Sequence, residues 1–99
     1  MSTKFADDRI VSASKDAVTC EFGEGVALLD LRSNVYYSLN SIGAYVWELI
    51  QEPTYVSKIS EAVIARYDVA PARCREDVNG LLKGLADAGL VKRHDQEFV

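Results

Sequence analysis

The spacing of apolar residues changes near residue 40, from the alternation of strands to the longer period of helices. Before that point, residues 17–22 alternate weakly, with Val18, Cys20 and Phe22 on one face. Such alternation predicts a half-buried strand, with this apolar face toward the core. Two further strands are predicted at residues 26–31 and 35–39.

Short turns connect the three predicted strands. Gly23 and Gly25 flank the first turn, and glycine adopts positive φ at little cost. Residues 32–34 form the second turn, so the strands are expected to pair as an antiparallel meander. Adjacent strand residues point to opposite faces, so Tyr36 and Tyr37 cannot both face the core.

Three helices are predicted after residue 40. Asn40 or Ser41 can cap the first helix, whose apolar residues recur at helical spacing until Pro53 ends the segment. The second helix is expected at residues 56–67, and Pro71 suits the first turn of the third helix. The predicted inner stripe of the third helix consists of Cys74, Val78, Leu81, Leu82 and Leu85.

The predicted architecture is one α+β domain spanning residues 1–99, with an ordered core at about residues 9–93. A three-stranded antiparallel sheet is followed by three helices. Gly89 is expected to end the third helix, after which Leu90 and Val91 fold back onto the core. Short helices joined by tight turns beside a sheet also describe a winged helix-turn-helix.

Composition and charge exclude several classes of protein. A hydrophobic share of 48% is sufficient for a core. No apolar run is long enough to span a bilayer, and the first residues lack the apolar segment of a secretory signal, so a cytoplasmic protein is expected. The net charge is −4 and neither half of the chain is basic, so nucleic-acid binding has no strong electrostatic driving force.

Candidate catalytic and metal-binding residues are few. His94 is the only histidine and is expected in a frayed tail. Cys20 and Cys74 lack ligand spacing with it, and neither has an evident base beside it, so no metal site, cofactor or enzymatic activity is predicted. Two reduced, partly buried thiols are favoured over a disulfide.

Three consecutive runs of the sequence resemble the PqqD-like family, the small RiPP recognition elements that bind ribosomally made, modified peptides. These runs are VALLDLRSNVYYSLNSIGAYVWELI, VSKISEAVIARYDV and REDVNGLLKGLADAGLV. The similarity extends over about Arg9 to Lys92, and the order and spacing of the runs are more specific than any one of them.

The resemblance implies a binding protein without chemistry of its own. It implies that the leader segment of a precursor peptide adds a strand to the edge of the strand at residues 35–39 and lies against the third helix. Carried over by position, the expected peptide-binding residues are Val35, Tyr36, Tyr37, Ser38, Arg75, Val78, Leu81, Leu82 and Leu85.

In this interpretation, one member of each of two neighbouring pairs faces the core and the other faces the peptide-binding groove. Tyr37 is assigned to the core face, whereas Tyr36 either leans over the docked peptide or shields an exposed sheet face. Leu81 and Leu82 point about 100° apart on a helix, so one can fill the core while the other lines the groove. Val78 and Leu82 are assigned to the groove.

The expected partners follow from the same resemblance. The chain is similar to the stand-alone proteins of lasso-peptide clusters, in which a separate leader peptidase and a cyclase, or another modifying enzyme, receive the precursor. A peptide chaperone of pyrroloquinoline quinone biosynthesis and a winged-helix nucleic-acid-binding regulator are the alternatives. No nucleic acid or membrane is expected as a partner, and the chain is expected to be a monomer or a weak edge-paired dimer.

Overall fold

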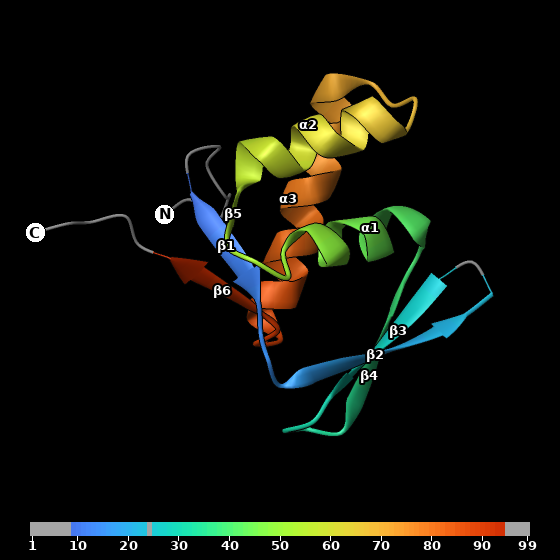
Figure 1. The fold of residues 1–99 in the computed structure, drawn as a ribbon, viewed down its shortest axis with the longest axis vertical. Coiled ribbons are helices and arrows are strands. Elements are labelled where there is room, and N and C mark those ends of the chain that lie inside the picture. The colour runs from blue at the N-terminus through green and yellow to red at the C-terminus, as the bar shows by residue number, and fades with distance from the viewer. Residues whose placement is uncertain (1–8, 24, 95–99) are drawn as a thin grey trace, which may run out of the picture.

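A computed structural model of the chain describes residues 9–23 and 25–94 (Figure 1). The predicted α+β class is correct, and the three helices follow the strands of the predicted meander. The chain ends that were expected to fray lie outside the described residues, apart from His94. In order, the elements are β1 (Ile10–Ala13), β2 (Ala17–Phe22), β3 (Gly25–Asp30), β4 (Val35–Leu39), α1 (Ser41–Leu49), β5 (Thr54–Tyr55), α2 (Val56–Arg66), α3 (Pro71–Asp87) and β6 (Val91–His94).

The predicted meander forms a three-stranded antiparallel sheet in the order β2-β3-β4. Thr19 pairs with Leu28, and Leu28 pairs with Tyr37, which fixes the register across all three strands. Figure 1 shows this sheet projecting away from the helices, with α1 following directly from β4. The sheet therefore contributes to the core with one face only.

The face of β2 that contributes to the core is the opposite of the predicted one. Ala17 packs against the core, whereas Val18 is 46% exposed and Cys20 is exposed. The side chain of Phe22 lies outside the described part of the structure. The prediction was wrong because alternation separates the two faces of a strand but does not determine which face the helices cover, and α1 lies on the side of Ala17 and Thr19.

A second, smaller sheet joins both ends of the described chain and was not predicted. Its order is β5-β1-β6, and both pairings are antiparallel. His94 belongs to β6 rather than to a frayed tail, and its Nε2 lies 2.7 Å from Ser12 Oγ. This sheet packs beside α3 and fixes the chain ends to the core.

The helices begin and end where the sequence signals lie. Asn40 caps α1, and its side-chain oxygen accepts a hydrogen bond of 2.8 Å from the backbone N–H of Gly43. Pro71 is at the start of α3. The backbone N–H groups of Gly89 and Leu90 donate to the carbonyls of Ala86 and Leu85, an arrangement known as a Schellman motif.

The core lies between the helices and the inner faces of the two sheets. Leu82 and Leu90 are fully buried there together with Ile50 and Ile59. Leu90 and Val91 do fold back onto the core, as predicted. Fully burying one such aliphatic side chain contributes about 1.5–3 kcal/mol, so this cluster is the main source of stability.

Arg32 connects the turn between β3 and β4 to the end of α3. Its backbone N–H donates to Asp30 Oδ1 at 3.0 Å, and its guanidinium donates to the carbonyl oxygen of Gly89 at 3.1 Å. Gly89 has a φ of +81°, and a Cβ there would lie 2.5 Å from the Arg32 guanidinium. The positive φ favours glycine at this position, whereas the Arg32 guanidinium is the end of a flexible, exposed side chain that can move away from a Cβ.

The two cysteines are free, as predicted, but their environments differ. Cys20 is exposed on the outer face of β2, so the expectation that it is partly buried was wrong. Cys74 is buried in α3, and burial raises the pKa of its thiol. The neutral thiol lies 3.8 Å from the carbonyl oxygen of Ser60 and is a poor nucleophile in this setting.

Candidate functional site

β4 is an edge strand, because it pairs with β3 and with no other described strand. An edge strand presents a row of backbone N–H and C=O groups that can pair with another extended chain. Nothing in the described structure covers this edge with a further strand. The sequence prediction required this edge to be vacant, and no strand among residues 9–23 and 25–94 occupies it.

The hydrogen-bond pattern identifies which residues of β4 face the free edge. The backbone N–H of Leu31 donates to the carbonyl of Asp16 at 2.8 Å, so these two residues form a hydrogen-bonded pair between β2 and β3. Such pairs alternate along antiparallel strands. Carried through the register, the alternation directs the backbone groups of Tyr37 toward β3 and those of Tyr36 and Ser38 toward the free edge.

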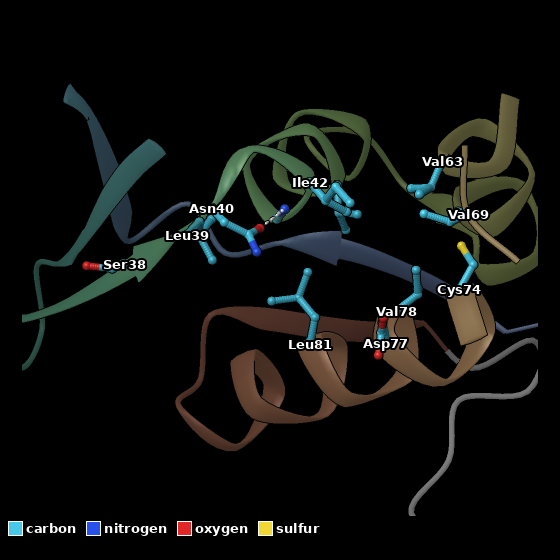
Figure 2. Close-up of a pocket in the computed structure, with 12 residues that line it drawn as sticks. Ser38, Leu39, Asn40, Ile42, Val63, Val69, Cys74, Asp77, Val78 and Leu81 are labelled. Carbon is cyan, nitrogen blue, oxygen red and sulfur yellow. Dashed lines mark hydrogen bonds between the residues drawn. The ribbon is translucent and has the colours of Figure 1, made fainter. Parts of the chain in front are cut away.

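A cleft of about 270 Å³ lies beside the end of β4 (Figure 2). Three helices and the end of β4 form its walls, and Leu81 points from α3 toward the β4–α1 side of the cleft. The volume is sufficient for one large side chain of an incoming peptide. The lining residues are Ser38, Leu39, Asn40, Ile42, Gly43, Val46, Val63, Val69, Cys74, Asp77, Val78 and Leu81.

The cleft is apolar in its interior and polar at its mouth. Val46, Val63 and Cys74 are all buried and have no charge to offer a ligand. Asp77 is the one charged residue of the lining, and its carboxylate pairs with the Arg73 guanidinium at 3.5 Å. The shape and the apolar interior of the cleft suit an apolar side chain.

The predicted site residues fall into two groups, of which the first lies at the edge and the cleft. Val35 and Tyr36 are 44% and 67% exposed, and Ser38 is exposed at the mouth of the cleft. Tyr37 is half-buried and packs against the core, which agrees with its assignment to the inner face. Val78 and Leu81 form the α3 wall of the cleft.

The second group consists of three predicted residues that do not line the cleft. Leu82 is fully buried in the core and Leu85 is 5% exposed there, and neither lines the cleft. Of the two neighbouring leucines, Leu81 faces the cleft and Leu82 faces the core, whereas Leu82 was predicted to line the groove. Arg75 does not belong to the face of α3 on which Cys74, Asp77, Val78 and Leu81 recur at i, i+3, i+4 and i+7.

Sequence reasoning missed the walls that α1 and α2 contribute to the cleft. Ile42 and Val46 were correctly assigned to the apolar face of α1, and Val63 to that of α2. An apolar face has the same period whether it fills the core or lines a cleft, so periodicity could not separate the two roles. The capping residue Asn40 at the mouth was predicted only for its structural role.

Two other kinds of site are absent from residues 9–23 and 25–94. No group of three or more histidine, cysteine, aspartate or glutamate residues there could hold a metal ion. No helix in the same part of the chain has the length and apolar character needed to cross a membrane. A backbone edge beside an apolar cleft is thus the best-defined candidate site.

A free strand edge beside an apolar cleft in a small α+β domain is the arrangement that peptide-docking domains use. The chain belongs to the PqqD family, since the model of that family, described as coenzyme PQQ synthesis protein D, matches residues 25–91. This match includes β4, α3 and every residue that lines the cleft. A comparison with curated proteins gives no match.

Solved structures of similar fold extend this result. TbiB1 in complex with the TbiA(beta) leader peptide is 26% identical, with a TM-score of 0.74 over 86% of this chain and 99% of that chain. A lasso peptide synthetase B1 complexed with the leader peptide is 20% identical, with a TM-score of 0.71 over 83% and 96%. The PqqD part of Methylobacterium extorquens PqqCD, described as a functional and stand-alone RiPP recognition element, is 23% identical, with a TM-score of 0.73 over 92% and 97%.

Proposed function

We propose that this protein binds the leader segment of a ribosomally synthesised precursor peptide and delivers it to a separate enzyme. The leader adds a strand to the free edge of β4 and places an apolar side chain in the cleft between β4, α1 and α3. The observation that carries this proposal is the vacant edge of β4 directly beside that cleft. Relatives whose structures contain leader peptides support it.

The proposed division of labour follows from the chemistry of the two parts. Backbone pairing at Tyr36 and Ser38 gives affinity for any extended chain, because it does not read side chains. The cleft gives specificity, because it admits an apolar side chain and excludes a charged one. Tyr36, which is 67% exposed on the outer face, contacts the added strand from that side.

We further propose that the chain itself is not an enzyme and acts in the cytoplasm, where a ribosomal precursor is made. A lasso-peptide pathway, with a separate leader peptidase and cyclase, is the favoured setting, since one similar structure is a lasso peptide synthetase B1. Biosynthesis of pyrroloquinoline quinone is the alternative that the family description suggests. The short reading frames beside the gene distinguish the two, because the precursors differ.

A nucleic-acid-binding winged helix is not supported by the charges on α3. Arg73 pairs with Asp77, and Lys83 pairs with Asp87 at 3.1 Å. These i, i+4 pairs neutralise two bases of the helix that would enter the major groove. Salt-sensitive binding of duplex DNA at micromolar concentration would contradict this interpretation.

The test is a proline substitution at the free edge. Tyr36→Pro removes a backbone donor that faces the edge and leaves the bonds between β3 and β4 intact, so the fold should survive. Leader peptides synthesised from reading frames beside the gene should bind this variant at least about tenfold more weakly in calorimetry. Unchanged affinity would exclude strand addition at β4.

Two control variants distinguish the loss of the backbone donor from the loss of the Tyr36 ring and from a loss of fold stability. Tyr36→Ala keeps the donor and loses the ring, so its remaining affinity measures what the side chain contributes. Tyr37→Pro removes a donor that faces β3 and should destabilise the sheet, with a lower melting temperature. A Tyr36→Pro variant that melted like Tyr37→Pro would show that the edge assignment is wrong.

A further inference from the structure

The sheet that contains β4 has a second free edge, formed by β2. β2 pairs only with β3 among the described strands. The same alternation that orients β4 directs the backbone groups of Val18 and Cys20 toward β3, starting from the bond between Leu31 and Asp16. The backbone N–H and C=O groups of Ala17, Thr19 and Glu21 therefore face away from the sheet.

Two hollows lie along this edge, between β2 and α1. One, of about 330 Å³, extends from the turn end of β2 to the last turn of α2, and the other, of about 510 Å³, lies at the start of β2. They share Thr19, Trp47 and Glu48, so they are parts of one continuous groove. The groove offers both an unpaired backbone row and a helical wall, which is the combination required for docking an extended chain.

The charged side chains that line the groove indicate the charge of the peptide that fits it. Glu21 from β2 and Glu48 from α1 are exposed and line it, and Gln51 adds a polar group at its open end. The one cation in the lining is Arg66, whose guanidinium lies over the Tyr45 ring at 4.6 Å. An extended chain whose inward side chains are basic complements the two carboxylates.

The outer face of β2 determines which outward side chains suit a peptide docked along this edge. Val18 is 46% exposed and Cys20 is exposed, and their cross-strand neighbours on this face are Leu29 and Ala27. The face therefore carries no charge across β2 and β3. A strand added at β2 extends this apolar face when its outward side chains are apolar.

We propose that the β2 edge and its groove beside α1 form a second docking surface, which takes an extended segment of a protein partner with alternating basic and apolar residues. The proposal does not require β4 to bind a leader, since the two edges are separated by about 10 Å across three strands. A second copy of this chain is a poor occupant, because its own β2 would bring another Glu21 toward the same carboxylates.

The test uses the whole chain and two synthetic pentapeptides of opposite charge, acetyl-Val-Lys-Val-Lys-Val-amide and acetyl-Val-Glu-Val-Glu-Val-amide. Titration of the ¹⁵N-labelled protein should shift the amides of Ala17, Thr19 and Glu21 and the Trp47 indole saturably with the lysine peptide. The glutamate peptide should bind at least about tenfold more weakly. Absence of saturable shifts at millimolar lysine peptide would overturn the proposal.

Variants locate the binding on the edge. Thr19→Pro removes an outward donor without removing a bond to β3, and Glu48→Gln removes one carboxylate from the exposed side of α1. Each should weaken the lysine peptide several-fold, and Glu48→Gln should also reduce the salt dependence of binding. If Thr19→Pro does not fold, Glu48→Gln still tests the proposal.

The control is Tyr36→Pro, which should leave the lysine peptide bound as in the wild-type protein. A loss of binding in that variant, or shifts centred on Tyr36 and Ser38, would show that the peptide uses the β4 edge instead. Equal affinity of both peptides, or a dimer in sedimentation that Thr19→Pro converts to a monomer, would refute a basic occupant. None of these results decides whether β4 binds a leader, which the calorimetry of Tyr36→Pro with leader peptides tests separately.

Discussion

Neighbouring residues on α3 have opposite surroundings, and this contrast determines what each one does. Leu82 is fully buried, whereas Leu81 is half-buried and lines the cleft. Leu82→Ala should lower the free energy of unfolding by about 2–5 kcal/mol, because it leaves a cavity in the core. Leu81→Ala should cost less stability and should weaken leader binding. Denaturant unfolding and calorimetry on both variants measure the two effects.

The two leucine variants are controls for each other. If Leu82→Ala lost leader affinity while it kept its stability, Leu82 and not Leu81 would be the groove residue. If Leu81→Ala changed neither quantity, the cleft would have no part in binding.

Asp30 makes the stability of the fold depend on pH in the acidic range. Its side chain is buried, and the hydrogen bond from the backbone N–H of Arg32 is the main reason that the pKa of this carboxyl lies below its ordinary value. A lowered pKa in the folded state stabilises the fold above the unfolded value of about 4, and this contribution is lost as the pH falls through the folded value. Stability of the wild-type protein should therefore decline in that acidic range.

The substitution Asp30→Asn tests this dependence. The variant should be less stable than the wild type at neutral pH, and the difference should shrink in acid, where the wild-type carboxyl is protonated as well. Urea midpoints measured from neutral pH down to acid follow the change. Two profiles that stay parallel throughout would show that Asp30 does not contribute through its charge.

At the scale of elements, the sequence predicted what depends on local signals. The cap at Asn40, the proline at the start of α3 and the Schellman motif at Gly89 fix the helices within a residue or two of the prediction. The second sheet was not predicted, because it pairs β1 with β6, about 80 residues apart in the chain, through very short strands. No local pattern carries such a pairing.

The candidate site could be predicted only in part, because some of its walls follow from local sequence patterns and others from long-range packing. The edge strand and the α3 wall follow from alternation, helical period and family resemblance, whereas the α1 and α2 walls depend on how three helices pack. The order of Leu81 and Leu82 depends on the rotation of α3 by about one residue, or about 100°, which periodicity does not determine when both positions are apolar.

At the scale of the whole molecule, the β2-β3-β4 sheet combines a buried inner face with two open edges. The core joins the helices to both sheets, since Leu28 of β3 and Leu39 of β4 are buried in it together with Val11 and Val91 of the other sheet. Neither outer edge of the β2-β3-β4 sheet pairs with a further strand among the described residues (Figure 1). A sheet with two free edges risks pairing with other chains, and natural proteins usually protect such edges. Here both edges adjoin a cleft or groove, which is consistent with two docking surfaces on one small sheet.

β6 is a place where stability can be changed without altering the cleft or the groove, because none of its residues lines either of them. Val91 is 6% exposed and pairs with Ala13, whereas Lys92 is exposed on the same strand. Val91→Asp would bury an unpaired carboxylate and should lower the melting temperature by about 10 °C or more, since about 1 kcal/mol corresponds to about 4–8 °C in a domain of this size. Lys92→Asp is the matched control and should melt close to the wild type. Because β6 supplies no residue to the cleft or to the groove, the folded Val91→Asp protein at low temperature should bind leader peptide with wild-type affinity. Weaker binding there would mean that the two sheets are energetically coupled.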